Sequence, residues 1–209
     1  MSVEGIREDW FPTSIWYFDH HELKGHHDLW RSELYRIREE DRVGITSRST
    51  QLGWHSETNL HQNPAFKPLI EVIYEAGEEV ADFGQWALSD YRVELLNAWG
   101  IINPQHGYNT LHNHPLSFLS GVYYLQTPAN CGEIEFRDPR EVRMMEVIPQ
   151  VSNNRWTYKT VQYQPVEGRM IIFPSWLLHQ VKPNLNTDDR ICISFNLGCS
   201  PRINSENEK

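Results

Sequence analysis

Cysteine is scarce in this sequence, with three among 209 residues. An odd and small number of cysteines gives no disulfide framework and favours a reducing compartment, so we expect a cytoplasmic protein. Apolar runs are also short. None approaches the roughly 20 residues of a membrane-spanning helix, and the N-terminal residues are partly acidic without the apolar segment of a secretory signal. We therefore expect no membrane partner.

Basic residues are too few for a protein that binds nucleic acid. The chain has 19 Lys and Arg against 28 Asp and Glu, which gives a formal net charge of −9. No dense run of Lys and Arg occurs, and binding to phosphate backbones depends on such side chains. We therefore expect no nucleic-acid partner. No pattern in the sequence indicates the oligomeric state.

Two segments in the first ninety residues have the apolar spacing of amphipathic helices. They span residues 21–42 and 65–86, and the apolar stripes comprise Leu23, Leu29, Trp30, Leu34 and Ile37 in the first, and Leu69, Ile70, Ile73, Val80 and Phe83 in the second. Gly, Ser, Thr and Asn between them predict a loop with one short strand. Residues 1–90 are therefore expected to be mostly helical.

From residue 91 the pattern changes to short strands. The segments YRVELLNAWGIIN, SGVYYLQT, GEIEFRD, GRMIIFP and RICISFNLG are each bounded by Gly, Pro, Asn or Asp, and WTYKTVQYQP adds one more. Several short strands at similar spacing predict a sandwich or a barrel-like pair of sheets. Because no linker separates the two parts, we expect a single domain over residues 1–209, mainly β, with helices before a core at 91–199.

Three histidines indicate a metal site. His112 and His114 precede a strand-like run, and residues two apart in a strand point the same way. His179 follows the apolar strand of GRMIIFPSWLLHQVKP. Neutral imidazole is the commonest protein ligand for metals. On spacing alone, two exposed histidines near a turn are the alternative.

The segment RICISFN has two faces of different chemistry. Alternation along a strand puts Arg190, Cys192, Ser194 and Asn196 on one face and apolar residues on the other. Polar groups that point into a β core need partners. An arginine there requires an anion, and we expect a carboxylate because guanidinium pairs with it in a bidentate manner.

Four segments in order, HNHPLSFLSGVYYL, CGEIEFRDPR, GRMIIFPSWLLHQVKPN and RICISFN, resemble the iron(II)- and 2-oxoglutarate-dependent oxygenases. The likeness is greatest to a bacterial and phage type distantly similar to prolyl hydroxylases, and it spans about residues 95–198. It implies a double-stranded β-helix, that is, a jelly-roll or cupin-like barrel. It also implies a dioxygenase that uses Fe(II), 2-oxoglutarate and O₂, hydroxylates a protein side chain or a small metabolite, and releases succinate and CO₂.

The resemblance also implies roles for single residues. His112 and His179 would bind the iron, and Arg190 would hold the far carboxylate of 2-oxoglutarate. Hydroxyl groups near 2-oxoglutarate would come from Ser194, Tyr124 and, as a weaker candidate, Tyr108.

Two positions depart from the family pattern. The Arg-x-Ser pair often found on the last strand is Arg190, Ile191 and Cys192 here, with Ser194 two residues further on. Most relatives have Asp or Glu two residues after the first histidine, where this chain has His114. His114 itself, or a more distant carboxylate of Asp138 or Glu135, would then be the third metal ligand, or the site has two protein ligands with water or an anion. The alternative functions are a three-histidine dioxygenase of the cupin type without 2-oxoglutarate, and a non-catalytic metal-binding barrel.

Overall fold

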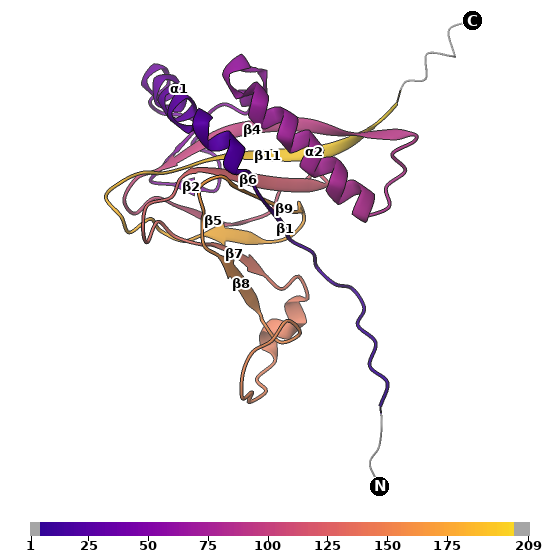
Figure 1. Cartoon of the computed structure of the whole chain (residues 1–209). Helices are drawn as coiled ribbons and strands as arrows, with labels where there is room; N and C mark the ends of the chain where they lie inside the picture. Colours follow the sequence, from indigo (N-terminus) through magenta and orange to yellow (C-terminus); the bar gives the residue numbers. More distant parts are fainter. Residues whose placement is uncertain (1–4, 203–209) are drawn as a thin grey trace, which may run out of the picture.

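Two antiparallel β-sheets face each other in the computed structural model, which describes residues 5–202 (Figure 1). The larger sheet has the order β1 (Trp16–Asp19), β9 (Arg169–Pro174), β6 (Leu119–Gln126), β11 (Arg190–Pro201), β4 (Tyr91–Asn103) and β3 (Trp54–His55). The smaller sheet has the order β2 (Thr50–Gln51), β5 (Tyr108–His112), β10 (His179–Val181), β7 (Ile134–Arg137) and β8 (Thr160–Tyr163).

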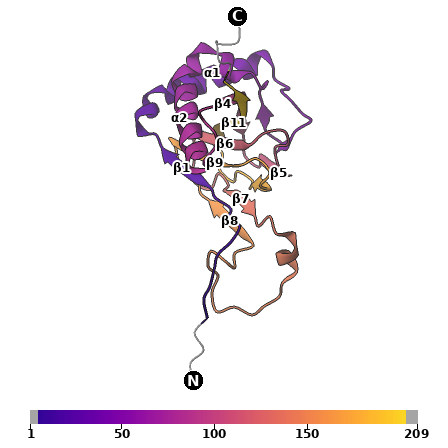
Figure 2. The ribbon, with the colours of Figure 1, turned by 90° about the vertical axis from the view of Figure 1, so that its right-hand side faces the viewer.

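Two helices, α1 (His27–Glu40) and α2 (Lys67–Phe83), cover the outer face of the larger sheet (Figures 1 and 2). They correspond to the two predicted helical segments. Short 3₁₀ turns precede them: η1 (His21–His26) before α1, and η2 (Leu60–Gln62) with η3 (Pro64–Phe66) before α2. No helix within residues 5–202 is long and apolar enough to cross a membrane.

Two residues of the predicted apolar stripes are exposed, contrary to prediction. The buried face of α1 consists of His27, Trp30 and Leu34, and Leu29 lies off that face. Phe83 is the last residue of α2, where its ring contacts the edge of Trp16 and is otherwise exposed. Helical spacing therefore located both helices but misplaced the edge and the end of the apolar face.

The first ninety residues supply more strands than were predicted. β1 pairs with β9 and extends the larger sheet, while β2 pairs with β5 in the smaller one. Between the helices, where one short strand was predicted, the structure has two, β2 and β3. Residues 138–159, with the 3₁₀ turn η4 (Glu141–Met145), extend away from the sheets (Figure 2).

Buried apolar residues form two layers, one on each side of the larger sheet. The first lies between the helices and the sheet and contains Trp30, Leu69, Ile193 and Phe195. The second lies between the two sheets and contains Tyr124 and Cys192, among others. The predicted alternation along β11 is confirmed, because Ile191, Ile193 and Phe195 join the helix-facing layer and Cys192 the inner one.

Candidate metal and cosubstrate site

A cavity of about 770 Å³ opens between the two sheets. The inner faces of β4, β5, β6, β10 and β11 contribute to its walls, together with the segment before β2. All three predicted metal ligands line it, and so does Arg190. The inward side chains therefore come from strands that are far apart in sequence and are brought together by the sheet order.

The three histidines converge in this cavity. His112 ends β5 and lies opposite His179, the first residue of β10, with ring centroids 4.2 Å apart. His114 lies just beyond the end of β5, and its ring centroid is 5.1 Å from both of the others. One ring nitrogen from each residue lies within 4.8 Å of the other two, a spacing that could hold a metal ion. The strand argument fits His112, whereas His114 reaches the site from the following turn.

Each imidazole is oriented by a hydrogen bond at Nδ1. The partners are oxygen atoms that can only accept: Thr110 O for His112 (2.7 Å), Asn196 Oδ1 for His114 (2.6 Å) and Leu177 O for His179 (2.9 Å). Nδ1 therefore carries the proton in all three rings, and the lone pair is at Nε2. Ser49 Oγ also lies 3.3 Å from His112 Nε2. This tautomer is the one that offers Nε2 to a metal.

Burial keeps the three rings neutral. It lowers the pKa of each below its ordinary value, and it lowers the pKa of His114 to about 4. Mutual repulsion between the rings lowers the pKa of His179 and His114 further. Three neutral imidazoles with converging lone pairs fit a divalent cation, because the cation would remove the repulsion between those lone pairs.

Neither predicted carboxylate lies beside the triad. Glu135 accepts hydrogen bonds from Gln162 (2.6 Å) and Gln180 (2.8 Å) on the smaller sheet. Asp138 accepts hydrogen bonds from Arg140, the closest at 2.8 Å. Neither lines the cavity. The structure thus brings His114, and not a carboxylate, to the other two histidines.

Arg190 is buried in the same cavity without an anionic partner. One guanidinium nitrogen donates to the carbonyl oxygens of Cys131 (3.2 Å) and Gly132 (3.3 Å), and Nε has no partner. Within residues 5–202, no carboxylate forms an ion pair with it. A buried cation of this kind is costly unless an anion compensates it. The expected need for a carboxylate at Arg190 therefore follows from the geometry.

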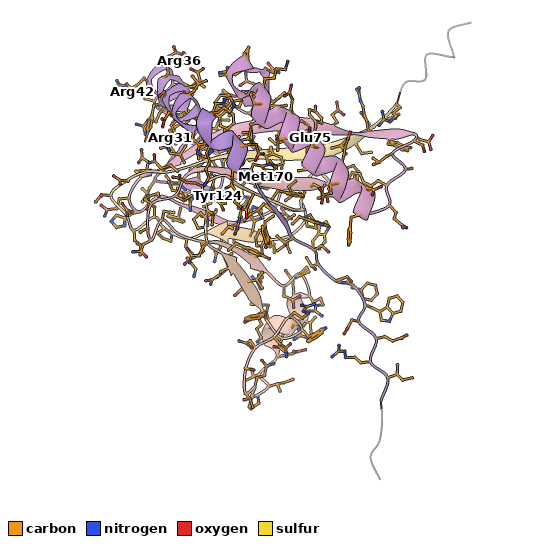
Figure 3. All side chains as sticks on the ribbon, viewed as in Figure 1. Arg31, Arg36, Arg42, Glu75, Tyr124 and Met170 are labelled. Atoms are coloured by element: carbon orange, nitrogen blue, oxygen red, sulfur yellow. The ribbon has the colours of Figure 1, made fainter. Side chains whose placement is uncertain are left out.

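Two of the three predicted hydroxyl groups line the cavity. Tyr124 lies in the layer between the sheets (Figure 3), and burial raises the pKa of its phenol, so that the hydroxyl remains a donor. Ser194 lies two residues before Asn196 on the inner face of β11. Burial raises the pKa of Cys192 to about 11, so its thiol is neutral and fills part of the cavity wall.

Tyr108 does not line the cavity. Strict alternation would place it on the same face as His112 in β5. However, β5 has an extra residue relative to β10, because His179 pairs with His112 and Val181 pairs with Asn109. Such a bulge exchanges the two faces of the strand. Asn109 consequently faces the cavity, and Tyr108 lies opposite Gln51 of β2.

Several cavity residues were not singled out from the sequence. Asn97, Trp99 and Ile101 follow a two-residue period on β4, which would have identified them as one face. The Trp99 ring stacks on His55, with centroids 5.5 Å apart, and lies 5.7 Å from the ring of His114. Arg48 comes from the loop before β2, where no periodic pattern marks it.

The β core is similar in sequence to a known protein family. Residues 97–196 match the family described as "Putative 2OG-Fe(II) oxygenase". Over this stretch, just under half of the chain, the protein is similar to the 2OG-Fe(II) oxygenases. The matched residues include the three histidines, Tyr124 and Arg190. The cofactors of this family are Fe(II) and 2-oxoglutarate, with O₂ as the oxidant. No curated protein matches the chain in sequence.

Solved structures share the double-stranded β-helix fold of these oxygenases. A Pseudomonas putida prolyl-4-hydroxylase superposes with a TM-score of 0.60 at 14% identity, covering 88% of this chain and 92% of its own. HygX from Streptomyces hygroscopicus, with nickel, 2-oxoglutarate and hygromycin B bound, gives 0.61 at 13% identity, over 89% and 83%. The 2-oxoglutarate-dependent epimerase SnoN from nogalamycin biosynthesis gives 0.63 at 10% identity, over 91% and 81%.

Proposed function

We propose that this 2OG-Fe(II) oxygenase is a hydroxylase in which His112, His114 and His179 hold the iron. The support is the common tautomer and the neutral state of the three rings, with one nitrogen of each within 4.8 Å of the others. Iron held by these residues would supply the activation of O₂, with 2-oxoglutarate as the reductant and succinate and CO₂ as its products.

The observation that carries the use of 2-oxoglutarate is the buried guanidinium of Arg190. It lines the same cavity as the triad and has no carboxylate partner within residues 5–202. A dicarboxylate can reach a metal with one end and this guanidinium with the other. The Tyr124 hydroxyl would donate to the cosubstrate, and Ser194 would complete its hydrogen bonds. Tyr108 has no part in this proposal, because it lies outside the cavity.

The protein residues have three tasks in this proposal. Arg190 neutralises the cosubstrate, and Tyr124 orients it. Apolar side chains such as Ile134, Val122 and Phe173 line the same walls and exclude water from the reacting atoms. The carbonyl oxygens that accept from Nδ1 of His112 and His179 keep those rings turned toward one point.

Hydroxylation as the outcome follows the likeness to the prolyl-4-hydroxylase, whereas SnoN is an epimerase with the same fold. The substrate is a protein side chain or a small molecule.

We also propose that residues 1–209 form a single domain and that the protein is cytoplasmic. The location rests on three cysteines that are all free in the structure, and absence of a nucleic-acid partner rests on the net charge of −9.

The test is an anaerobic titration with Fe(II) and 2-oxoglutarate, monitored by the visible charge-transfer band of their chelate. We expect the band in the wild-type protein and its loss in His114→Ala. Arg190→Met should need about 100-fold more 2-oxoglutarate, because it removes a buried charge pair worth about 2–5 kcal/mol. Arg42→Met is the matched control, since it removes the same charge from an exposed site paired with Glu39.

The absence of the band in the wild-type protein would contradict the proposal. The observation that favours a second candidate is the ligand set itself, three histidines without a carboxylate. A metal-loaded protein that consumes O₂ without 2-oxoglutarate would be a three-histidine dioxygenase of the cupin type. A protein that binds metal but consumes no O₂ under either condition would be a non-catalytic metal-binding barrel.

A further inference from the structure

We propose that the substrate is an anion of the carboxylate type and that Arg48, at the mouth of the cavity, selects it. This inference rests on the proposed function, because it assigns to the substrate the part of the cavity that 2-oxoglutarate leaves free. It is carried by the charge of the cavity walls, by the position of Arg48 and by an unpaired hydrogen-bond donor in the wall of the same cavity.

The cavity walls contain no acidic side chain within the described part of the chain, although the protein has 28 Asp and Glu residues. They contain two arginines, Arg48 and Arg190. Acidic residues thus outnumber basic ones over the whole protein but are missing from this surface. Clefts lined by one sign of charge concentrate ligands of the opposite sign.

The cosubstrate would neutralise only part of the positive charge of the cavity. Iron(II) and two arginines bring four positive charges, and the three histidines are neutral. 2-Oxoglutarate removes two of the four. A carboxylate ligand at position 114 would have removed a third, but that position is His114. Two positive charges would therefore remain in a partly enclosed cavity, and an anionic substrate would compensate one of them.

Arg48 is placed to meet that anion. It lies in the loop before β2, is exposed, and forms no ion pair within residues 5–202. It lines the cavity, and the next residue along the chain, Ser49, has its hydroxyl 3.3 Å from Nε2 of His112, so Arg48 lies on the triad side. Arg190 is buried between the sheets, so the two cations serve different ends of the cavity.

A hydrogen-bond donor without a partner lies on the same side. Trp99 is 8% exposed and lines the cavity, and its indole Nε1 is buried with no acceptor in the structure. A buried donor left unpaired costs about 1–3 kcal/mol. Its ring is held by stacking on His55 and by the contact with the ring of His114. A carboxylate paired with Arg48 has a second oxygen that can accept from this N–H.

The test compares two probes of the same shape and different charge, benzoate and benzamide. They are titrated into the nickel-loaded protein saturated with 2-oxoglutarate, and binding is measured by the broadening of their proton NMR signals by nickel. We expect benzoate to bind about tenfold more tightly than benzamide, as a charge-assisted hydrogen bond allows. Arg48→Met should bring the two within about twofold, whereas Arg42→Met, beyond the end of α1 (Figure 3), should keep the difference.

Equal binding of the two probes to the wild-type protein would overturn the proposal. A preference for benzoate that survives Arg48→Met, or no measurable benzoate binding, would do the same. Failure of the proposed function is recognised separately, by the absence of the iron chelate band in the wild-type protein. In that case the same probe comparison on the nickel-loaded protein without 2-oxoglutarate still decides whether Arg48 selects anions.

Discussion

The amide of Asn196 holds His114 in place, and Asn196→Leu should weaken metal binding. Asn196 Oδ1 accepts from His114 Nδ1 (2.6 Å) and from Ser120 Oγ (2.7 Å), and Nδ2 donates to Asn97 Oδ1 (2.8 Å). Leucine has a similar shape but no polar atom. The substitution therefore removes all three hydrogen bonds without leaving a large void.

The magnitude follows from which partners stay unpaired. Ser120 can turn its hydroxyl to Ser175 Oγ, which lies 2.9 Å away, so its loss is small. His114 has no such substitute at Nδ1, and a buried unpaired donor costs about 1–3 kcal/mol. Loss of a hydrogen bond to a metal-bound histidine typically lowers metal affinity about 10–100-fold. We expect a decrease in this range for Asn196→Leu.

The assay is competition for nickel against a chromophoric chelator, at a pH where all variants are folded by circular dichroism. Asn196→Asp is the conservative partner, because a carboxylate oxygen can still accept from His114 Nδ1 and should restore most of the affinity. Ser175→Ala removes the far member of the network and leaves the bond between Asn196 and His114 intact. It should therefore bind nickel within about twofold of the wild-type protein.

Wild-type nickel affinity in a folded Asn196→Leu protein would refute this reasoning. It would mean that the ring of His114 is oriented by packing against Trp99 and the other two histidines, whose centroids lie 5.1–5.7 Å away. Equal losses in Asn196→Leu and Asn196→Asp would also contradict it, because the aspartate keeps the acceptor.

Three further predictions concern the cosubstrate, the core and the pH dependence. Tyr124→Phe should lower 2-oxoglutarate affinity about fivefold in the chelate titration and leave the melting temperature unchanged, because no hydrogen bond from residues 5–202 reaches this hydroxyl. Gly121→Ala should lower the free energy of unfolding in urea by about 1–3 kcal/mol, since the new methyl group would overlap the Phe195 ring; an unchanged midpoint would contradict this. Glu33, hydrogen-bonded to Arg36, has its pKa lowered from 4.5 to about 2, so its contribution is present above pH 4.5 and is lost as the pH falls toward 2. Glu33→Gln should remove about 1 kcal/mol of this dependence from unfolding curves measured between those pH values, and an unaltered slope would contradict the assignment.

Sequence reasoning located elements whose evidence is local. The helices over residues 27–40 and 67–83 show their apolar period within one segment, and so do the long strands β4 and β11. β1 and β2 are short, and each is a strand only because it pairs with a segment more than fifty residues away. Nothing in their own residues records that partner. The prediction for residues 1–90, mostly helical with one short strand between the helices, therefore missed β1 and one of the two strands between the helices.

The register of β5 is the second feature that could not be predicted from the sequence. Tyr108 was a weaker candidate implied by the resemblance, whereas one extra residue in β5 turns Asn109 toward the cavity instead. A bulge changes the face of every residue before it and leaves no mark in composition. The structure brings His114 together with His112 and His179, and His114 reaches the other two from the residues after β5 and not from the strand.

The residues that sequence could reveal are those for which burial is costly. β11 is covered on both faces, so Arg190, Cys192, Ser194 and Asn196 interrupt its apolar pattern at positions where a polar side chain needs a partner. That cost makes each of them informative, and all four line the cavity. Arg48 is exposed on a loop, where arginine is common, so no burial cost marks it in the sequence. Its significance appears only when the fold places it in the wall of the cavity that holds the three histidines, a surface from which acidic side chains are missing.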